Sequence, residues 1–419
     1  MAHPSDASQP QPIATALALA LGAAISLGLA RFSYALLLPS MREDLGWSYM
    51  IAGSMNTANA GGYFIGALFC PWVFKKISAP KIFIASALLT SIFLGISGAV
   101  TDTTALFLLR LFAGIFSAFV FVGGGILAAQ LANLHHRKSG LILGIYYGGT
   151  GIGIVLACLI TPIAVDWSIH QKLNHIWQLG WWALALTGCL LTLFLAKPSL
   201  SIETAPSVRD SSQTTAISSY GKIVFAYFCF GMGYIGYMTF VIALLRQIGM
   251  SAQLINIFYA ILGCCVMASS RLWARMLDVY KGGKSLFTLN GLLAIATLIP
   301  AIIDAWHSET GPLSPLSIGA IYFSGVIFGG CFLSAVASTT AFVKHNLPQS
   351  QWISGITVFT ITFAIGQVIG PTLTGWISDH FGSLSMGLTL SSCILIVGSA
   401  VAYQQQPLAQ KGKPHPTSL

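Results

Sequence analysis

Three arginines lie inside long apolar stretches of this sequence: Arg31, Arg110 and Arg271. A charged side chain at the centre of a bilayer costs at least about 2.5–3.5 kcal/mol, so such a cation is expected to face a cavity or a partner. Arg31 precedes Leu38, the end of its stretch, by seven residues, which places it near the middle of a membrane-crossing segment. Arg110 follows Asp102 by eight residues, or about 12 Å at the rise of a helix. Arg271 lies near the end of its stretch and can reach lipid phosphates.

No Asp, Glu or His lies in the interior of the predicted apolar segments, so Arg31 and Arg110 have no counter-ion there. Their remaining partners are backbone carbonyls, water or an anionic substrate. Anion binding by Arg31 is the favoured interpretation, and a structural hydrogen-bonding role is the alternative. All eight cysteines fall in the same segments, with no cluster of nucleophile, paired carboxylates or metal ligands. This pattern argues against an enzyme and predicts neither a metal nor a cofactor.

Polar and aromatic side chains could complete a binding site around these arginines. Asn56, Asn59 and Tyr63 are spaced so that they share one face of a helix. The other candidates from the apolar segments are Tyr34, Tyr234, Tyr237, Tyr322 and Gln367. A buried amide often does no more than bond to a neighbouring helix, so packing is the alternative role for each residue. As a set they predict a moderately polar, aromatic-rich pocket.

Twelve apolar segments must position these residues. A chain with 55% hydrophobic and 7% charged residues is unlike a soluble domain, in which about a quarter of residues are charged. Each segment is long enough to cross a hydrocarbon core of roughly 30 Å as a helix. The predicted spans are residues 13–38, 49–74, 81–101, 104–132, 139–165, 177–196, 221–246, 254–277, 284–304, 315–343, 352–378 and 384–404.

Lys and Arg fall almost entirely in every second gap between these spans. The gaps and tails of one side hold Lys75, Lys76, Lys81, Arg137, Lys138, Lys197, Arg209, Lys222, Arg275, Lys281, Lys284, Lys344, Lys411 and Lys413. The other side has only Arg42, Lys172 and Arg246. The positive-inside rule makes the basic side, with both termini, cytoplasmic. A bacterial-type inner membrane is the expected location, and the net charge of +9 reflects topology and contact with membrane lipids rather than nucleic-acid binding.

A polar segment splits the twelve spans into two groups of six. The predicted organisation is a cytoplasmic tail at 1–12, a six-helix bundle at 13–196, a cytoplasmic linker at 197–220, a second bundle at 221–404 and a tail at 405–419. The halves also share patterns, because Ser139-Gly140 precedes Gly151 by the same spacing that separates Ser354-Gly355 from Gly366. The sequence therefore predicts an all-α membrane protein with two pseudo-symmetric bundles of six transmembrane helices.

Two stretches carry a family resemblance. The run from Leu29-Ala30-Arg31-Phe32-Ser33-Tyr34 through Leu45-Gly46-Trp47-Ser48, together with Gly61-Gly62-Tyr63-Phe64-Ile65-Gly66-Ala67-Leu68, resembles the YbfB/YjiJ-like branch of the major facilitator superfamily. The resemblance implies a carrier, sufficient as a monomer, whose spans 1 and 4 line a central cavity. It also implies that Arg110-Leu111-Phe112-Ala113-Gly114 matches a span-4 motif linked to proton coupling or substrate contact.

The superfamily also carries a latch in which an acidic helix end and basic loop residues meet on the cytoplasmic side. In the first half, Phe74 stands where the acid would be, followed by Lys75 and Lys76. The second half keeps the acid as Asp278, near Arg275, so a latch is expected there and simple charge anchoring is the alternative. In span 11, the stretch from Gly366 to Pro371 is expected to weaken the helix and flex during gating, with close packing as the alternative.

These features predict a secondary active transporter that moves a small organic anion, a carboxylate or sulfonate, by alternating access, with Arg31 as the anion contact and Arg110 nearby. Without a carboxylate in the spans, exchange for another anion or proton symport fits better than an Asp or Glu proton relay. The alternative is an efflux pump for amphipathic drugs or metabolites that uses the aromatic residues of spans 1, 7 and 10. A non-transporting sensor with this fold would need an output domain.

Overall fold

The computed structural model of this protein describes residues 11–135, 138–202, 219–306 and 313–408, and these residues form helices without any β-strand among them. The first half contains α1 (Pro12–Ala23), the π-helical segment η1 (Ala24–Phe32), α2 (Tyr34–Leu45), α3 (Tyr49–Lys76), α4 (Ala79–Ser97), α5 (Thr103–Leu134), α6 (Ser139–His170) and α7 (Gln178–Leu200). The second half contains α8 (Gly221–Gln247), α9 (Ala252–Leu272), α10 (Ala274–Val279), α11 (Lys284–Trp306), α12 (Pro315–Asn346), the short 3-10 turn η4 (Gln349–Gln351), α13 (Trp352–Phe381) and α14 (Leu384–Tyr403).

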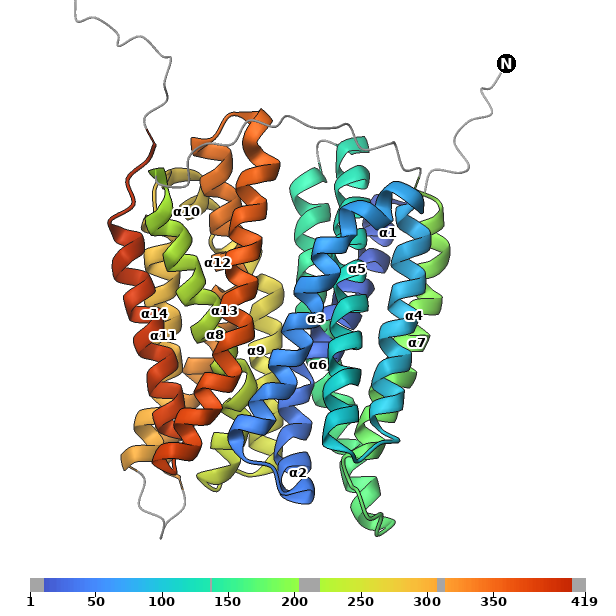
Figure 1. The fold of residues 1–419 in the computed structure, drawn as a ribbon, viewed down its shortest axis with the longest axis vertical. Coiled ribbons are helices and arrows are strands. Elements are labelled where there is room, and N and C mark those ends of the chain that lie inside the picture. Colours follow the sequence, from blue (N-terminus) through green and yellow to red (C-terminus); the bar gives the residue numbers. More distant parts are fainter. Residues whose placement is uncertain (1–10, 136–137, 203–218, 307–312, 409–419) are drawn as a thin grey trace, which may run out of the picture.

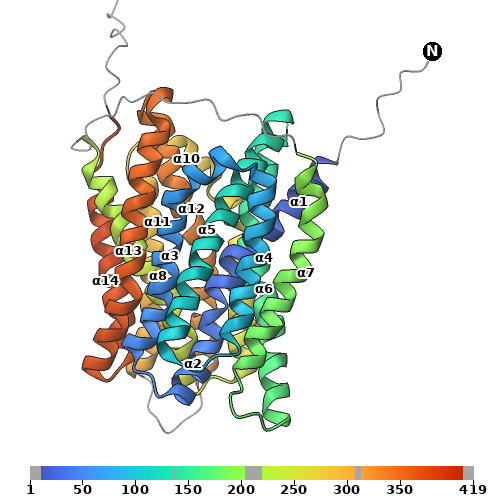
Figure 2. The ribbon, with the colours of Figure 1, turned by 45° about the vertical axis from the view of Figure 1, so that its right-hand side comes forward.

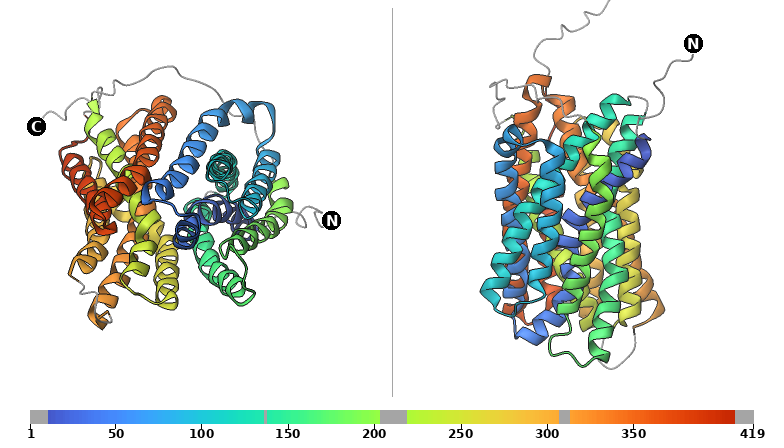
Figure 3. Two further views of the ribbon diagram at one scale, coloured as in Figure 1. Left: turned by 60° about the horizontal axis from the view of Figure 1, so that its bottom comes forward. Right: turned by 90° about the vertical axis from the view of Figure 1, so that its right-hand side faces the viewer.

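The helices form two bundles that lie side by side with their long axes roughly parallel (Figure 1). One bundle contains α1 to α7 and the other α8 to α14, and the division is also clear in the end-on view (Figure 3). The start of α1, the end of α7, the start of α8 and the end of α14 share one end of the molecule, which we call the linker end (Figure 1). The other end is called the opposite end.

Eleven of the described helical segments are long and apolar enough to cross a membrane, counting Pro12–Leu45 as one. The helix α3 is not among them, although it was the second span predicted from the sequence. It is 28 residues long, and Asn56, Thr57 and Asn59 lower its hydropathy. These polar side chains form hydrogen bonds with other helices, and α3 runs along the bundle beside them (Figure 2).

The observed ends of several helices differ from the predicted spans. The first span continues through Pro39 to Leu45, and residues 254–277 are divided at Trp273 into α9 and α10. The helix α7 continues to Leu200, into the predicted linker, with Pro198 inside it. Residues 203–218 of that linker and the outer parts of both predicted tails lie outside the described residues, as do Arg137, Arg209, Lys411 and Lys413.

The two bundles meet through α3 against α13 and α6 against α9. Both contacts depend on glycine. A Cβ on Gly53 would lie 2.3 Å from the carbonyl oxygen of Pro371, and a Cβ on Gly151 would lie 2.4 Å from the carbonyl oxygen of Gly263. Hydrogen bonds add to this packing. The hydroxyl of Thr57 donates to the carbonyl of Val368 at 2.8 Å, and that of Tyr259 donates to the carbonyl of Phe32 at 2.9 Å. These contacts bring the middle of the first span against the second bundle.

Candidate functional site

Arg31 is carried by the π-helical segment η1. The chain here is wound more widely than an α-helix, and the N–H of Ser33 donates to the carbonyl of Gly28, five residues earlier, at 3.0 Å. π-Helical turns are rare and are frequent at functional sites. Gly28 allows this segment to lie against α6, because a Cβ at that position would be 2.4 Å from the Cα of Gly153. The wide turn places Arg31 among α3, α8 and α13.

The guanidinium of Arg31 is 2% exposed and has one nitrogen without a partner. Its Nε donates to Oδ1 of Asn59 at 3.1 Å, and its Nη1 donates to Oε1 of Gln367 at 3.4 Å. The ring of Tyr63 lies over the guanidinium at 5.2 Å, and the hydroxyl of Tyr234 also interacts with it. Nη2 forms no hydrogen bond with any described residue. Arg31 therefore joins the two bundles and keeps an unused donor.

Arg110 is equally buried, at 2% exposure, but a different pair of its nitrogens is used. Nη1 donates to the carbonyl of Ala30 at 2.6 Å, and Nη2 donates to Oδ1 of Asn56 at 3.1 Å. The rings of Tyr34 and Trp181 lie 4.9 and 5.5 Å from its Cζ. Only Nε lacks a partner among the described residues. These bonds tie α5 to the π-helical segment and to α3.

The two asparagines of α3 connect the arginines to the rest of the site. Nδ2 of Asn59 donates to the carbonyl of Arg110 at 3.3 Å, and Nδ2 of Asn56 donates to the hydroxyl of Thr239 on α8 at 2.7 Å. Their position requires a close approach of α3 to α5. A Cβ on Gly114 would lie 2.1 Å from the carbonyl oxygen of Asn59, so no larger residue fits there without displacing α3.

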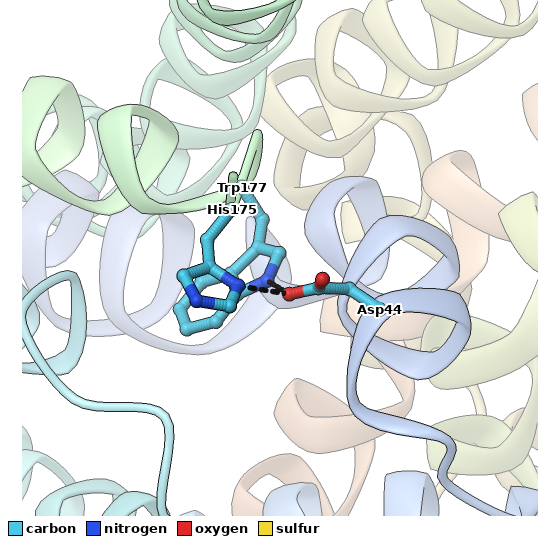
Figure 4. Close-up of polar contacts among 3 residues, drawn as sticks. All are labelled: Asp44, His175 and Trp177. Atoms are coloured by element: carbon cyan, nitrogen blue, oxygen red, sulfur yellow. Dashed lines mark hydrogen bonds and ion pairs between the residues drawn. The ribbon is translucent and has the colours of Figure 1, made fainter. Parts of the chain in front are cut away.

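No carboxylate neutralises either arginine within the described part of the chain. The ion pair found there within 4.0 Å joins Asp44 and His175, at the opposite end (Figure 4). Oδ2 of Asp44 lies 2.7 Å from Nδ1 of His175 and accepts a hydrogen bond from Nε1 of Trp177 at 2.6 Å. The site thus holds two guanidinium charges surrounded by amides, hydroxyls and aromatic rings, which is an arrangement suited to an anion.

The other predicted binding residues fall into two groups. Gln367 and Tyr234 belong to the arginine cluster, and Nε2 of Gln367 donates to the hydroxyl of Tyr234. Tyr237 instead shares a hydrogen bond of 2.7 Å with Ser324 and stacks on Phe328. The hydroxyl of Tyr322 donates to the carbonyl of Leu254, near the start of α9 at the opposite end, at 3.3 Å. Neither Tyr237 nor Tyr322 forms a hydrogen bond with either arginine among the described residues.

The residues of the predicted polar, aromatic-rich pocket are packed against one another in this structure. The arginines and the amides bond directly to one another, and the stacked rings of Phe230, Tyr234 and Phe363 fill the space beside them. A cavity of about 400 Å³ lies elsewhere, between α1, α6 and α9, where Arg271 is exposed. Another, of about 270 Å³, lies beside Tyr280 and Lys284. Neither is lined by Arg31 or Arg110.

The predicted gating residues form no latch in this state. Lys75 and Lys76 end α3, with Nζ of Lys76 4.0 Å from the ring of Trp72. Arg275 and Asp278 are both exposed on α10, and Asp278 has no ion pair with any residue that the structure describes.

The helix α13 also remains unbroken through the segment expected to flex. Gly366 packs on α8, where a Cβ would lie 2.5 Å from the carbonyl oxygen of Phe228. Pro371 lies inside the continuous helix and packs its carbonyl against α3. Close packing thus accounts for this segment in the conformation observed.

Two residues of the cluster are not among those that the sequence singles out. Trp181 is fully buried on α7 beside Arg110, and its Nε1 has no partner among the described residues. Thr239 on α8 receives the bond from Asn56. Trp and Thr are ordinary residues of membrane helices, so nothing in their local sequence marks them. Their role comes from helices that are far apart in the chain.

Similar proteins agree with this architecture. The chain is 23% identical over 389 residues to the "Putative tartrate transporter" of Agrobacterium vitis, covering 86% of each sequence. It is 20% identical over 279 residues to "Monocarboxylate transporter 10" of Danio rerio, covering 65% of this chain and 53% of that protein.

Solved structures of two transporters have the same fold. A bacterial homologue of the human lysosomal transporter Spinster matches with a TM-score of 0.70 at 14% identity, over 95% of this chain and 97% of that one. The nucleoside transporter NupG matches with a TM-score of 0.66 at 13% identity, over 93% and 96% of the two chains.

The family model described as "Uncharacterised MFS-type transporter YbfB" matches residues 23–403, which confirms the resemblance seen in the first two spans. Together with the two helical bundles and the transporters of the same fold, this match excludes an enzyme and establishes the general activity. The chain is a multi-pass membrane transporter of the major facilitator superfamily and belongs to its YbfB family.

Proposed function

We propose that this transporter moves a small organic anion, of the carboxylate or sulfonate class, by alternating access, and that Arg31 contacts the anion. The observation that carries the proposal is the unpartnered Nη2 of Arg31 on a side chain only 2% exposed. A buried guanidinium without a counter-ion is unfavourable, and a bound anion removes that penalty. A carboxylate or sulfonate also presents oxygens that match the planar fork of the guanidinium.

Arg31 is better suited to ligand contact than Arg110. Both Nη atoms of Arg110 are already bonded, to Ala30 and Asn56. Arg31 has Nη2 free and a long bond of 3.4 Å from Nη1 to Gln367, which an anion can replace at little cost. Arg110 then serves to position the segment that carries Arg31, and its charge adds to the attraction for an anion.

The position of Arg31 between the bundles supports alternating access. Asn59 comes from the first bundle, whereas Gln367 and Tyr234 come from the second. An anion that replaces the bond to Gln367 changes the interaction between the two bundles at the same moment. Binding can in this way be coupled to the relative movement of the halves.

The names of two relatives point to the same class of substrate. One refers to tartrate and the other to monocarboxylates, and both are carboxylate anions at neutral pH. Because no carboxylate of the described residues lies beside the arginines, coupling by exchange for a second anion, or by a proton carried with the substrate, is the mode we favour. We place the protein in a bacterial inner membrane as a monomer, with the linker end cytoplasmic and in contact with anionic lipids.

The test is the thermal stability of the purified transporter in a panel of carboxylates, sulfonates and amphipathic cations. A ligand at about 100 times its dissociation constant adds about 2.7 kcal/mol of stability. We expect selective stabilisation by an anion, lost in Arg31→Ala and strongly reduced in Arg31→Lys, because an ammonium cannot form the planar contact. The matched control is Arg271→Lys, an exposed arginine at the linker end, which should respond like the natural protein. An anion effect that is unchanged in Arg31→Ala would exclude the proposed contact.

An efflux pump for amphipathic compounds is the second candidate. The stacked aromatic rings of Phe230, Tyr234, Phe332 and Phe363, with neighbouring centroids 4.9–5.8 Å apart, offer a surface to which varied apolar ligands can bind. Stabilisation by several unrelated amphipathic cations, equal in Arg31→Ala and the natural protein, would replace the anion carrier with this alternative.

A further inference from the structure

A carboxylate from one bundle binds the start of a helix from the other at the opposite end of the molecule. Oδ1 of Asp379, near the end of α13, accepts a hydrogen bond from the N–H of Tyr49, and Oδ2 accepts one from the N–H of Met50, both at 2.8 Å. Tyr49 and Met50 are the first two residues of α3. The first N–H groups of a helix have no partner within it, and the helix dipole makes that end electropositive.

Neighbouring residues satisfy only some of the N–H donors at the start of α3. The hydroxyl of Ser48, just before α3, accepts a bond from the N–H of Ile51 at 3.2 Å. The N–H groups of Tyr49 and Met50 are left for an acceptor from outside the helix, and Asp379 supplies one oxygen to each. The carboxylate therefore completes the cap of α3 only while the two bundles are together.

The surrounding contacts hold the same two helices together. A Cβ on Gly375 of α13 would lie 2.3 Å from the carbonyl oxygen of Tyr49, so the backbones almost touch. The hydroxyl of Tyr49 donates to Gln247 at 3.4 Å, and Arg42 lies over its ring at 3.8 Å. Asp304 is a further charge near Tyr49. None of these side chains replaces the acceptor that Asp379 provides.

We propose that Asp379 is a gating residue, which keeps the transporter closed at the opposite end until α3 and α13 separate. The inference rests on the proposed alternating access. Opening that end exposes Arg31 only if the two hydrogen bonds to Asp379 break. The N–H groups at the start of α3 then bond to water instead. Charge-assisted bonds to backbone N–H groups are among the stronger hydrogen bonds of proteins, so they favour the closed arrangement. Asp278, where the latch was expected, has no comparable contact among the described residues.

The test compares hydrogen–deuterium exchange of the natural protein, Asp379→Asn and Asp379→Glu in detergent or nanodiscs. Asn has the same shape as Asp but no charge, and its amide group turns a donor toward the N–H groups of α3. Glu keeps the charge and should fall between Asn and the natural residue. The matched control is Asp166→Asn, because Asp166 is an exposed carboxylate on α6 at the same end and has no hydrogen bond with a described residue of the other bundle.

In Asp379→Asn we expect residues 49–57 and 372–381 to exchange roughly tenfold faster, in line with the loss of bonds to a charged group. Residues 66–76 and 352–362, at the linker end, should exchange more slowly, because alternating access closes one end as the other opens. A residue with a purely structural role would loosen the opposite end without protecting the linker end. That result, or exchange like that of Asp166→Asn, would overturn the proposal.

The outcome is separate from the question of the substrate. The exchange measurement needs no ligand, and Asp379 does not contact Arg31. If anion-dependent stabilisation fails while the reciprocal exchange pattern is observed, the gating role stands and the assigned substrate class does not. If stabilisation by an anion is observed without the exchange pattern, the gating role alone is wrong.

Discussion

At the scale of single residues, we propose different roles for two arginines with the same burial, because different donors of each are used. Arg110 is bonded through both Nη atoms and lies between the rings of Tyr34 and Trp181. Arg31 retains a free Nη2. Burial of a cation does not distinguish a structural arginine from a binding one. The nitrogen that is left free supports the distinction that we propose, since it is Nη2 in Arg31 and Nε in Arg110.

Arg110→Gln should therefore lower stability in the absence of any ligand. The change leaves the carbonyl of Ala30 and the side-chain oxygen of Asn56 without their donors, which costs about 1–3 kcal/mol for buried groups. Thermal unfolding of the purified protein measures the effect. Arg271→Gln, at an exposed position, serves as the control and should change stability by no more than about 0.5 kcal/mol. Equal melting temperatures for the two variants would contradict the structural role of Arg110.

At the scale of helices, α3 is the element that assembles the site. It carries both asparagines, contacts α5 within its own bundle and contacts α8 and α13 across the interface. Small residues make these contacts possible, because lipid provides little driving force and helices must approach closely to associate. The π-helical segment contributes by turning Arg31 toward α3.

Gly62→Ala should disturb this assembly. A Cβ at Gly62 would lie 1.9 Å from the carbonyl oxygen of Leu111, so α3 must move away from α5. Overpacking of this kind typically costs about 1–3 kcal/mol, and the displacement of Asn59 should also weaken stabilisation by an anion. Thermal unfolding with and without anion measures both effects. The control is Gly140→Ala on α6, where an added Cβ would meet no described residue outside its own helix turn within 4 Å and the change should be neutral or slightly stabilising.

At the scale of the whole molecule, the two bundles and the distribution of charge define an orientation. The described basic residues Lys75, Lys76 and Lys138 lie at the linker end, and acidic residues such as Asp102 and Asp379 lie at the opposite end. The family match and the fold confirm a major facilitator transporter with helical bundles. The side of the membrane that each end faces remains a prediction from the positive-inside rule.

Reporter fusions test that orientation. A green fluorescent protein at the C-terminus should fluoresce, because it folds in the cytoplasm. Alkaline phosphatase fused after Gly249, in the turn between α8 and α9 at the opposite end, should be active, because it requires the periplasm. The same enzyme fused after Leu200, at the linker end, should be inactive. The reverse pattern would show that the basic end faces the periplasm.

Much of the architecture follows from local sequence. The apolar runs, the alternating charge of the gaps and the two matching halves lead to the twelve-helix arrangement, and the depth of Arg31 in its run identifies a buried cation before any contact is known. The spacing of Asn56 and Asn59 places them on one helix face. These are properties of neighbouring residues, because helix length, periodicity and insertion cost depend on composition over one or two turns.

The partners of these residues depend instead on how distant helices rotate and pack. Local sequence does not show that η1 is π-helical, that Trp181 covers Arg110, or that Tyr322 bonds to the carbonyl of Leu254. It also points to Asp278 for a latch, whereas the carboxylate that joins the bundles here is Asp379. A few degrees of helix rotation or a shift of one turn exchanges one partner for another without changing composition. The packing of the whole molecule decides which residues become partners. Backbone contacts at glycines and the hydrogen bonds of buried donors involve all the helices at once.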